Sequence, residues 1–329
     1  PVSQIFADLT ASNAEGQGVD LTAVRTLPEN FGVSVRGSEK GGKFELPGAM
    51  ARQWLSLPNP NGLPNSKVLR PWANGMDVTK RTSDTWLVDF GIGVSEVEAS
   101  MFQKPFEYLA CNVKVPRQNN SEGRTSEKWW LHRRSGEDLR AVIATVSRFI
   151  VTVRHSKFRI FMWMDARVYP DSALVVIARD ADTTMGVLHS RFHELWSLRL
   201  GTSIGVGNDP RYTPTTTFET FPFPESLTPN IAAKDYAENS HAQAIASAAS
   251  ALVEARDRWL NPVEWVDWVR TPEEETAGFP VRPVAKPGYE AALKKRTLTN
   301  LYNERPAWLA NLHAALDKAV ADAYGWEWP

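Results

Sequence analysis

The segment NDPRYTPTTTFETFPFPE, from Asn208 to Glu225, combines threonine, proline and aromatic residues in an order that suits neither a helix nor a regular strand. Proline fixes its own backbone and pushes the residue before it towards an extended conformation. The segment therefore predicts an ordered, extended connector. Because ordering a backbone costs conformational entropy, we expect the elements on both sides to make use of it.

The residues before this connector predict a mixed α+β domain. Apolar residues recur at helical spacing from Leu139 to Ile150 and again from Thr184 to Leu200. Between these two segments, the runs Phe158 to Met164 and Leu174 to Ala178 have the apolar, β-branched and aromatic composition of strands.

Strand signals also precede these elements. The runs Lys67 to Trp72 and Thr85 to Phe90 are β-like, with a turn expected around Asn74-Gly75 between them. Ser95 and Glu98 have the spacing of a capping box, in which each side chain satisfies a backbone N–H of the other residue. This pair predicts the start of a helix.

The two ends of the chain differ in character. The cluster Pro58 to Gly62 is a strong turn signal, and we place a boundary close to it. After Pro229, the spacing of apolar residues predicts amphipathic helices at Ile245 to Trp259 and Leu309 to Ala323. The predicted fold is therefore α+β, with a mixed-sheet domain at residues 65–229 and a C-terminal helical module at residues 230–329.

Composition excludes several classes of protein. The 329 residues are 43% hydrophobic and 23% charged, as in ordinary globular domains. No apolar run is long enough to span a bilayer, and the start has no secretion signal, so we expect a cytoplasmic location. Cys111 is the only cysteine, which excludes an internal disulfide and a cysteine-based zinc cluster. The sequence begins with Pro1 instead of methionine, and we expect it to be a fragment of a longer chain.

Charge is distributed unevenly along the chain. From Lys114 to Arg159 there are eleven basic and four acidic residues, whereas from Asn230 to Pro329 there are eleven basic and fourteen acidic ones. A local positive region on a molecule of net charge −1 is typical of polyanion binding. Most charge runs are simply solvated surface, and that alternative stays open.

Two short motifs suggest catalysis but fit it poorly. Phe90-Gly91-Ile92-Gly93 resembles part of a nucleotide-binding turn, yet no strand ending in an acidic residue follows it. Asp209-Pro210-Arg211-Tyr212 differs by one residue from the D-P-P-Y motif that grips a flipped base. Arg211 would place a cation beside the nitrogen that must act as nucleophile. We therefore expect no catalytic residue, no cofactor-binding residue and no metal ligand in this chain.

One pair of histidines and one pair of tryptophans have structural explanations. His189 and His193 are four apart, as in a metal-binding helix, but a third ligand is missing and a structural role is favoured. For Trp129 and Trp130, we expect one of the two to lie in the core.

Taken together, several motifs are similar to those of one family. They are LRPW from Leu69, NGMDV from Asn74, LHSRFH from Leu188, WSLRLG from Trp196, the Asn208 to Glu225 segment and RTLTNLYN from Arg296. Their sequence and order resemble the MmeI-like (type IIL) bacterial DNA methyltransferases of restriction-modification systems, over nearly the whole chain. In that family the cofactor and catalytic motifs lie upstream of the region seen here.

The resemblance implies the target-recognition domain and C-terminal region of an adenine-N6 DNA methyltransferase. Residues 1–64 would be the linker from the methyltransferase domain and the start of the recognition domain. The implied partners are double-stranded DNA and the methyltransferase domain of the same polypeptide, with no membrane. S-adenosylmethionine is expected only in the full-length enzyme.

Residue chemistry nominates the DNA contacts. Arginine and lysine neutralise phosphates, arginine pairs with guanine, and a carboxylate accepts a hydrogen bond from cytosine. Asp165 and Arg167 could read bases at a strand end, or could pair with each other. The predicted contacts are Lys114, Arg117, Arg124, Lys128, Arg133, Arg134, Arg154, His155, Lys157, Arg159, Asp165, Arg167, Arg199 and Arg211.

Two other functions remain open at this point. One is a divergent but intact S-adenosylmethionine-dependent methyltransferase, which would bind its cofactor. The other is a protein-interaction subunit of an antiviral defence complex, which would be indifferent to DNA.

Overall fold

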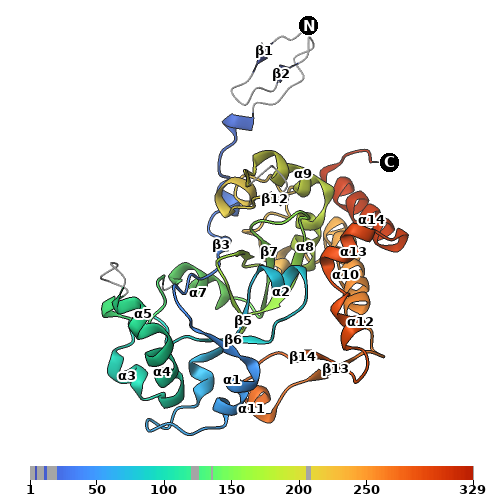
Figure 1. Ribbon diagram of the computed structural model, residues 1–329. Coiled ribbons are helices and arrows are strands. Elements are labelled where there is room, and N and C mark those ends of the chain that lie inside the picture. The colour runs from blue at the N-terminus through green and yellow to red at the C-terminus, as the bar shows by residue number, and fades with distance from the viewer. Residues whose placement is uncertain are drawn as a thin grey trace.

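The computed structural model describes residues 4–5, 11–12, 21–119, 126–134, 136–204 and 209–328 (Figure 1). It confirms the α+β class, with two four-stranded sheets and a group of C-terminal helices. The first 64 residues contribute a strand to each sheet, which are β3 (Ser34–Arg36) and β4 (Glu45–Pro47). A further pair of two-residue strands, β1 (Gln4–Ile5) and β2 (Ala11–Ser12), precedes them.

The first sheet has the order β3-β10-β7-β8, and all its neighbours are antiparallel. Its strands are β7 (Arg148–Val153), β8 (Phe161–Asp165) and β10 (Leu174–Ile177), together with β3. Side chains alternate between the two faces of a strand. Phe149 and Val151 accordingly join one hydrophobic core, whereas Ile150 joins another. This sheet therefore separates two cores.

The second sheet has the order β4-β6-β5-β9. Its central strands are β5 (Leu69–Ala73) and β6 (Thr85–Val88), which pair antiparallel. The short edge strand β9 (Tyr169–Pro170) pairs parallel with β5, so the chain passes directly from the first sheet into the second. Both strands predicted between residues 67 and 90 are confirmed. The expected turn at Asn74-Gly75 is instead the start of a helix, α2 (Gly75–Thr79), capped by the Asn74 side chain.

Short helices cover the second sheet. Ser95 and Glu98 form the predicted capping box, but the helix breaks at Met101 and Phe102 before it continues to Leu109. These helices are α1 (Gly48–Leu55), α3 (Glu96–Ser100), α4 (Gln103–Leu109), a π-helical turn (Ala110–Lys114), α5 (Val115–Gln118) and α7 (Glu137–Ile143).

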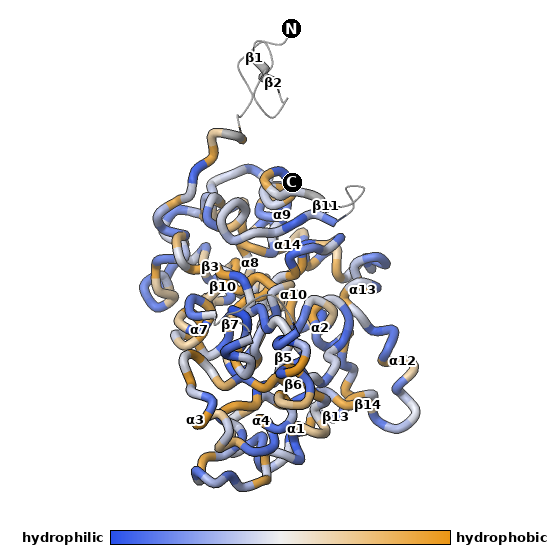
Figure 2. Tube along the Cα trace, turned by 60° about the vertical axis from the view of Figure 1, so that its left-hand side comes forward, coloured by the Kyte–Doolittle hydropathy of each residue, from blue (hydrophilic) through white to orange (hydrophobic). Residues whose placement is uncertain are grey.

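The long C-terminal helices pack against the first sheet from the other side. Helix α10 (Ser240–Leu260) contacts both α8 (Asp182–His189) and α14 (Ala307–Tyr324), and Gly325 ends α14 with a left-handed backbone. Helices α9 (Arg191–Leu200), α12 (Glu290–Lys294) and α13 (Leu298–Glu304) complete this group. Figure 2 shows hydrophobic segments concentrated around α8 and α10 in the middle of the molecule.

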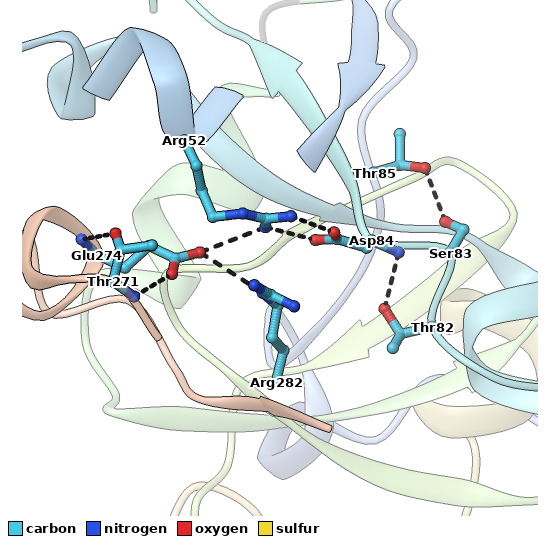
Figure 3. A network of polar contacts seen from close by, with 8 residues as sticks. All are labelled: Arg52, Thr82, Ser83, Asp84, Thr85, Thr271, Glu274 and Arg282. Carbon is cyan, nitrogen blue, oxygen red and sulfur yellow. Dashed lines mark hydrogen bonds and ion pairs between the residues drawn. The ribbon is translucent and has the colours of Figure 1, made fainter. Parts of the chain in front are cut away.

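An arm connects this helical module to the opposite end of the molecule. It comprises β13 (Val266–Val269), α11 (Pro272–Thr276) and β14 (Arg282–Ala285), and its helix packs on α1 (Figure 1). The Arg52 guanidinium bonds both oxygens of Asp84 at 2.9 and 2.6 Å and lies 3.5 Å from Glu274 of the arm (Figure 3). Glu274 is 2% exposed, so this ion network is inside the contact.

Two helical predictions need correction. The apolar spacing from Leu139 to Ile150 reads as one helix, but α7 ends at Ile143 and the residues from Arg148 onward form β7. A strand buried on both faces is continuously apolar, and such a run mimics a helical period. The predicted helix from Thr184 to Leu200 is two helices, because Ser190 has an extended backbone and caps the second one.

The connector that follows α9 is ordered, but it is not extended throughout. Residues Pro214–Phe218 form a single π-helical turn, with Phe218 fully buried. Asn30, also fully buried, donates its side-chain amide to the carbonyl oxygens of Phe218, Glu219 and Phe221. The connector is thus tied to the N-terminal part of the chain. Asn208 lies outside the described residues.

In the described part of the chain, no helix combines the length and apolar character needed to cross a bilayer.

Candidate nucleic-acid interface

Two arginines, one at the end of β3 and one directly after β7, converge on one backbone carbonyl. Arg36 Nε lies 3.0 Å from the Ser172 oxygen, and Arg154 Nη1 lies 3.4 Å from the same atom. Burial lowers the pKa of Arg154, and the positive charges of Arg36 and Arg211 lower it further. The three guanidinium groups are therefore close enough to repel one another.

Arg211 and His155 extend this positive region. The two residues form an isolated antiparallel bridge, and the N–H of Tyr212 donates to the carbonyl of Arg154 at 2.7 Å. Burial is the main cause that lowers the pKa of His155. The positive charges of Arg154, Arg211 and Arg159 lower it further, and the charge of Asp209 partly opposes them. His155 is therefore neutral near pH 7. Arg211 belongs to the connector, and these contacts place it beside the end of β7.

A surface cavity joins this region to a second pair of arginines. Its volume is about 420 Å³, and its lining includes Arg36, Arg133 and Arg134 together with the acidic residues Glu39, Glu137 and Asp138. Arg133 and Arg134 each approach Glu39, at 3.1 and 3.4 Å, and the side chain of Arg134 is 70% exposed. We call the set Arg36, Arg133, Arg134, Arg154 and Arg211 the arginine band. Arg36 ends β3, Arg133 and Arg134 precede α7, and Arg211 follows β12 (Asp209–Pro210); these three elements follow one another along one side of the molecule (Figure 1).

Sequence reasoning missed Arg36. It lies outside the basic region from Lys114 to Arg159, and only the pairing of β3 with β10 brings it beside Arg154. A basic residue on an apolar strand is the signal that was present, but the position of that strand in the sheet was not available from the sequence.

Two of the predicted contacts are internal. The Arg117 guanidinium is 4% exposed and donates to the carbonyl oxygens of Lys40, Gly41, Trp129 and Leu131. Arg159 is 8% exposed and donates to the Thr152 hydroxyl and to the carbonyls of Val153 and Pro210. Both side chains brace the fold, and we leave them out of the arginine band.

Four lysines and arginines lie elsewhere on the surface. Lys114 pairs with Glu96 at 3.6 Å beneath Trp129, and Lys157 donates to Asn303 of α13. Lys128 and Arg199 are exposed. Arg124 lies outside the described residues.

Asp165 and Arg167 occupy the opposite edge of the first sheet from Arg36. They do not pair through their side chains. Asp165 accepts the backbone N–H of Arg167 at 2.8 Å, and the Arg167 guanidinium donates to the carbonyl of Ala277 in the arm. The structure thus separates this pair from the arginine band.

The remaining aromatic and histidine candidates are structural. Trp129 and Trp130 are both buried, whereas we had expected one of them. His193 bonds the hydroxyl of Tyr212 at 2.9 Å, and His189 bonds Arg256 at 2.7 Å. No group of three potential metal ligands occurs in the described residues.

The two short motifs also have structural roles. Gly91 and Gly93 adopt left-handed backbones after β6, a strand whose two neighbours are antiparallel. A cofactor loop of the kind considered above belongs to a parallel βαβ unit. Tyr212 of the DPRY sequence is fully buried, so its ring has no face on which a flipped base could stack.

Comparison with known proteins gives one informative result. No family model matches the chain, and no curated protein matches its sequence. Among solved structures, the fold is similar to part of the type IIL restriction-modification enzyme MmeI, determined in complex with DNA, with a TM-score of 0.62 and 18% sequence identity. The match covers 100% of this chain and 37% of the enzyme, so the chain spans a little over a third of that enzyme's length. At this identity, the similarity establishes the fold.

Proposed function

We propose that this chain is the DNA-recognition part of a bacterial restriction-modification enzyme that methylates adenine at N6. The fold is similar to part of an enzyme whose structure was determined with DNA. The motifs from Leu69 to Asn303 resemble, in the same order, those of MmeI-like methyltransferases. The fold and the sequence motifs favour the same function.

The observation that carries the proposal is the composition of the arginine band. Within the described residues, no carboxylate lies within ion-pair distance of Arg36, Arg154 or Arg211. Guanidinium groups that lie close together without a directly paired carboxylate create a local positive field that favours a polyanion. Duplex DNA supplies one charge per about 1.7 Å of its axis, so a row of arginines can engage several phosphates at once.

Phosphate contacts fix the register of a protein on DNA, and contacts to base edges specify the sequence. We assign the arginine band to phosphate contact. Asp165 and Arg167 remain candidates for base reading, although their side chains contact the loop and the arm in the absence of DNA.

In this proposal the chemistry belongs to another part of the enzyme. The recognition part positions the target adenine, and a methyltransferase domain of the same polypeptide extrudes and methylates it. That domain would bind S-adenosylmethionine, for which the Gly91-Gly93 turn lacks the parallel strand arrangement.

The proposal is tested by DNA binding at several salt concentrations. Fluorescence anisotropy with a labelled 30-base-pair duplex should show log K falling by roughly 0.9 per log unit of salt for each phosphate contact. The triple variant Arg36→Gln, Arg154→Gln, Arg211→Gln should reduce this slope by about 2 to 3 and weaken binding similarly on all sequences. Lys294→Gln, on α12 at the far side of the molecule, is the matched control and should change neither (Figure 1).

Three results would count against this function. An unchanged slope in the triple variant would mean that the band is only solvated surface. Calorimetric binding of S-adenosylmethionine to this chain would favour an intact methyltransferase, and indifference to DNA at low salt would favour a protein-interaction subunit.

A further inference from the structure

A second group of basic side chains surrounds a small, partly open cavity that is separate from the arginine band. The cavity has a volume of about 90 Å³ and lies between the loop before β8, the helices α8 and α9, α13 and α14. One buried water requires about 15 Å³, so the space is several times larger than a water site. The lining includes Arg159, His189, Arg191, Arg305 and His313.

A buried arginine lies directly behind this cavity. Arg256 of α10 is 2% exposed, and it donates to His189 Nε2 at 2.7 Å and to the carbonyl of Phe161 at 3.0 Å. Among the described residues, no carboxylate is within ion-pair distance of Arg256. Burying an arginine without a counter-charge is unfavourable, which calls for an anion nearby.

The contact with Arg256 fixes the protonation of His189. A guanidinium group only donates hydrogen bonds, so His189 Nε2 must accept and the ring proton is on Nδ1. Burial and the charge of Arg256 hold the pKa of His189 well below its ordinary value, so the ring is neutral. Nδ1 is buried and has no hydrogen-bond partner in the described structure. His189 therefore presents an unpaired N–H donor.

Tyr302 and His313 continue the hydrogen-bond network of Arg256. Arg256 also donates to the Tyr302 hydroxyl at 3.3 Å, and that hydroxyl lies 3.0 Å from His313 Nε2. Tyr302 accepts from Arg256 and so donates its own proton to His313, which leaves the His313 proton on Nδ1. His313 is neutral because burial lowers its pKa to about 4. Both histidines thus have Nδ1–H donors.

Arg159 adds a second donor that is buried and unpaired. Its Nη atoms are held by Thr152, Val153 and Pro210, but its buried Nε–H has no partner in the described structure. Two carboxylates, Glu194 and Asp317, also line the cavity. Asp317 accepts the backbone N–H of Arg191 at 2.7 Å, and these two acids offset Arg191 and Arg305. Within the described part of the chain, no carboxylate pairs directly with Arg256, although the neighbouring Asp257 interacts with its charge.

We propose that this cavity binds a small tetrahedral oxyanion, a phosphate or the terminal group of a phosphomonoester. The ligand would accept from His189 Nδ1, His313 Nδ1 and the guanidinium groups, and would neutralise the charge of Arg256. It would also join α9 to α13 and α14. A cation is disfavoured because the arginines and histidines that line the cavity outnumber its two carboxylates, Glu194 and Asp317.

Titration calorimetry of the chain with inorganic phosphate tests this, with chloride at equal ionic strength as the reference. We expect saturable 1:1 binding and a higher melting temperature in phosphate, since a ligand that binds only the folded state stabilises it. Arg191→Gln should weaken the phosphate Kd tenfold or more. Arg258→Gln, an exposed arginine on α10 outside the cavity, and Arg154→Gln in the arginine band should leave it unchanged.

His313 offers a variant pair that separates binding from folding. In His313→Gln the side-chain oxygen can replace Nε2 as acceptor for Tyr302, but the Nδ1–H donor is lost, so phosphate binding should fall tenfold. In His313→Asn an amide N–H lies near the Nδ1 position, so binding should be partly restored. Equal stabilisation by phosphate and chloride, or equal Kd values for these variants and the Arg258→Gln control, would overturn the proposal.

A final competition experiment identifies the source of the oxyanion. A 5′-phosphorylated oligonucleotide that displaces inorganic phosphate, where its unphosphorylated counterpart does not, indicates a nucleic-acid end group. Failure of both to displace it indicates the free ion. Either result supports an oxyanion site, and neither depends on duplex recognition by the arginine band.

Discussion

Arg36 and Arg154 both donate to the carbonyl oxygen of Ser172, although Arg36 ends β3 and Arg154 follows β7, two strands that are not adjacent in the first sheet. Strand β10 lies between β3 and β7, and Ser172 precedes it. One carbonyl dipole offsets little of two positive charges, so the pair remains mutually repulsive. A protein keeps such an arrangement at a cost in stability, which makes sense where a polyanion binds.

This repulsion gives a prediction about stability. Arg36→Gln should raise the melting temperature, because it relieves Arg154 of a neighbouring positive charge, and should at the same time weaken DNA binding. The increase should be larger in 20 mM than in 300 mM salt, since ions screen exposed charges. Thermal unfolding followed by circular dichroism at both salt concentrations measures it. A fall in melting temperature of equal size at both would show that the Ser172 hydrogen bond matters more than the repulsion.

A second prediction concerns pH and the buried carboxylate of Asp89. Burial opposes its ionisation, but His132, Arg140 and Arg70 outweigh this effect and lower the pKa of Asp89 to about 2. Burial lowers the pKa of His132, so its ring is neutral at pH 7. At that pH the positive charge facing Asp89 comes from Arg140, at 2.7 Å, and Arg70, at 3.5 Å. Asp89 therefore holds two arginines at the end of β6.

Because the pKa of Asp89 is lower in the folded state than in the unfolded one, its contribution is present above about pH 4 and is lost as pH falls towards 2. A shift of this size corresponds to about 2 kcal/mol. Asp89→Asn should be destabilised at pH 7 by about 3 kcal/mol, because Arg140 loses its buried partner, and should lose less stability than the native chain between pH 4 and pH 2. Urea unfolding at pH 7, 4 and 2.5 measures both. Parallel curves for the two proteins would contradict this role.

A third prediction addresses Tyr212, the last residue of the DPRY sequence. Tyr212→Phe removes the hydroxyl that bonds His193 and leaves a buried ring nitrogen unpaired, which should cost about 1 to 3 kcal/mol. Duplex affinity should be unchanged, because the ring is inside the core and the backbone that positions Arg211 is intact. Urea unfolding and anisotropy on the same preparation give the two values. Unchanged stability together with weaker DNA binding would mean that the hydroxyl faces the nucleic acid.

Some parts of the fold could be predicted from the sequence and others could not. Local signals were sufficient where chemistry depends on near neighbours, as in the Ser95 and Glu98 capping box or the strands β5 and β6. Prediction failed where the outcome depends on tertiary position. The run from Leu139 to Ile150 changes from helix to strand because β7 is central in its sheet.

The site was predicted only in part for the same reason. A count of basic residues identified the region of Arg133, Arg134 and Arg154, but it could not separate surface arginines from Arg117 and Arg159, which serve backbone carbonyls. Arg36 required the order of strands, which follows from long-range pairing.

The last prediction concerns the arm and the buried Glu274 at its base. The Glu274 carboxylate accepts the backbone N–H of Thr271 and lies 3.5 Å from Arg52 and 3.9 Å from Arg282 (Figure 3). Glu274→Gln keeps a side chain that can cap the helix but removes the charge that faces two arginines. Since Arg52 retains Asp84, we expect a loss of about 2 kcal/mol, below the 3 to 5 kcal/mol of a fully broken buried pair. Hydrogen exchange should accelerate in β13, α11 and β14 before it does in β7.

The neighbouring carboxylate provides the control for this variant. Glu275 belongs to the same short helix and pairs with Arg270, but it is exposed, so Glu275→Gln should change stability by less than about 0.5 kcal/mol. If both variants cost the same, the effect arises from helix α11 itself and not from its contact with α1. If only Glu274→Gln loosens the arm, the ion network with Arg52 is what fixes the arm to the end of the molecule that carries α1.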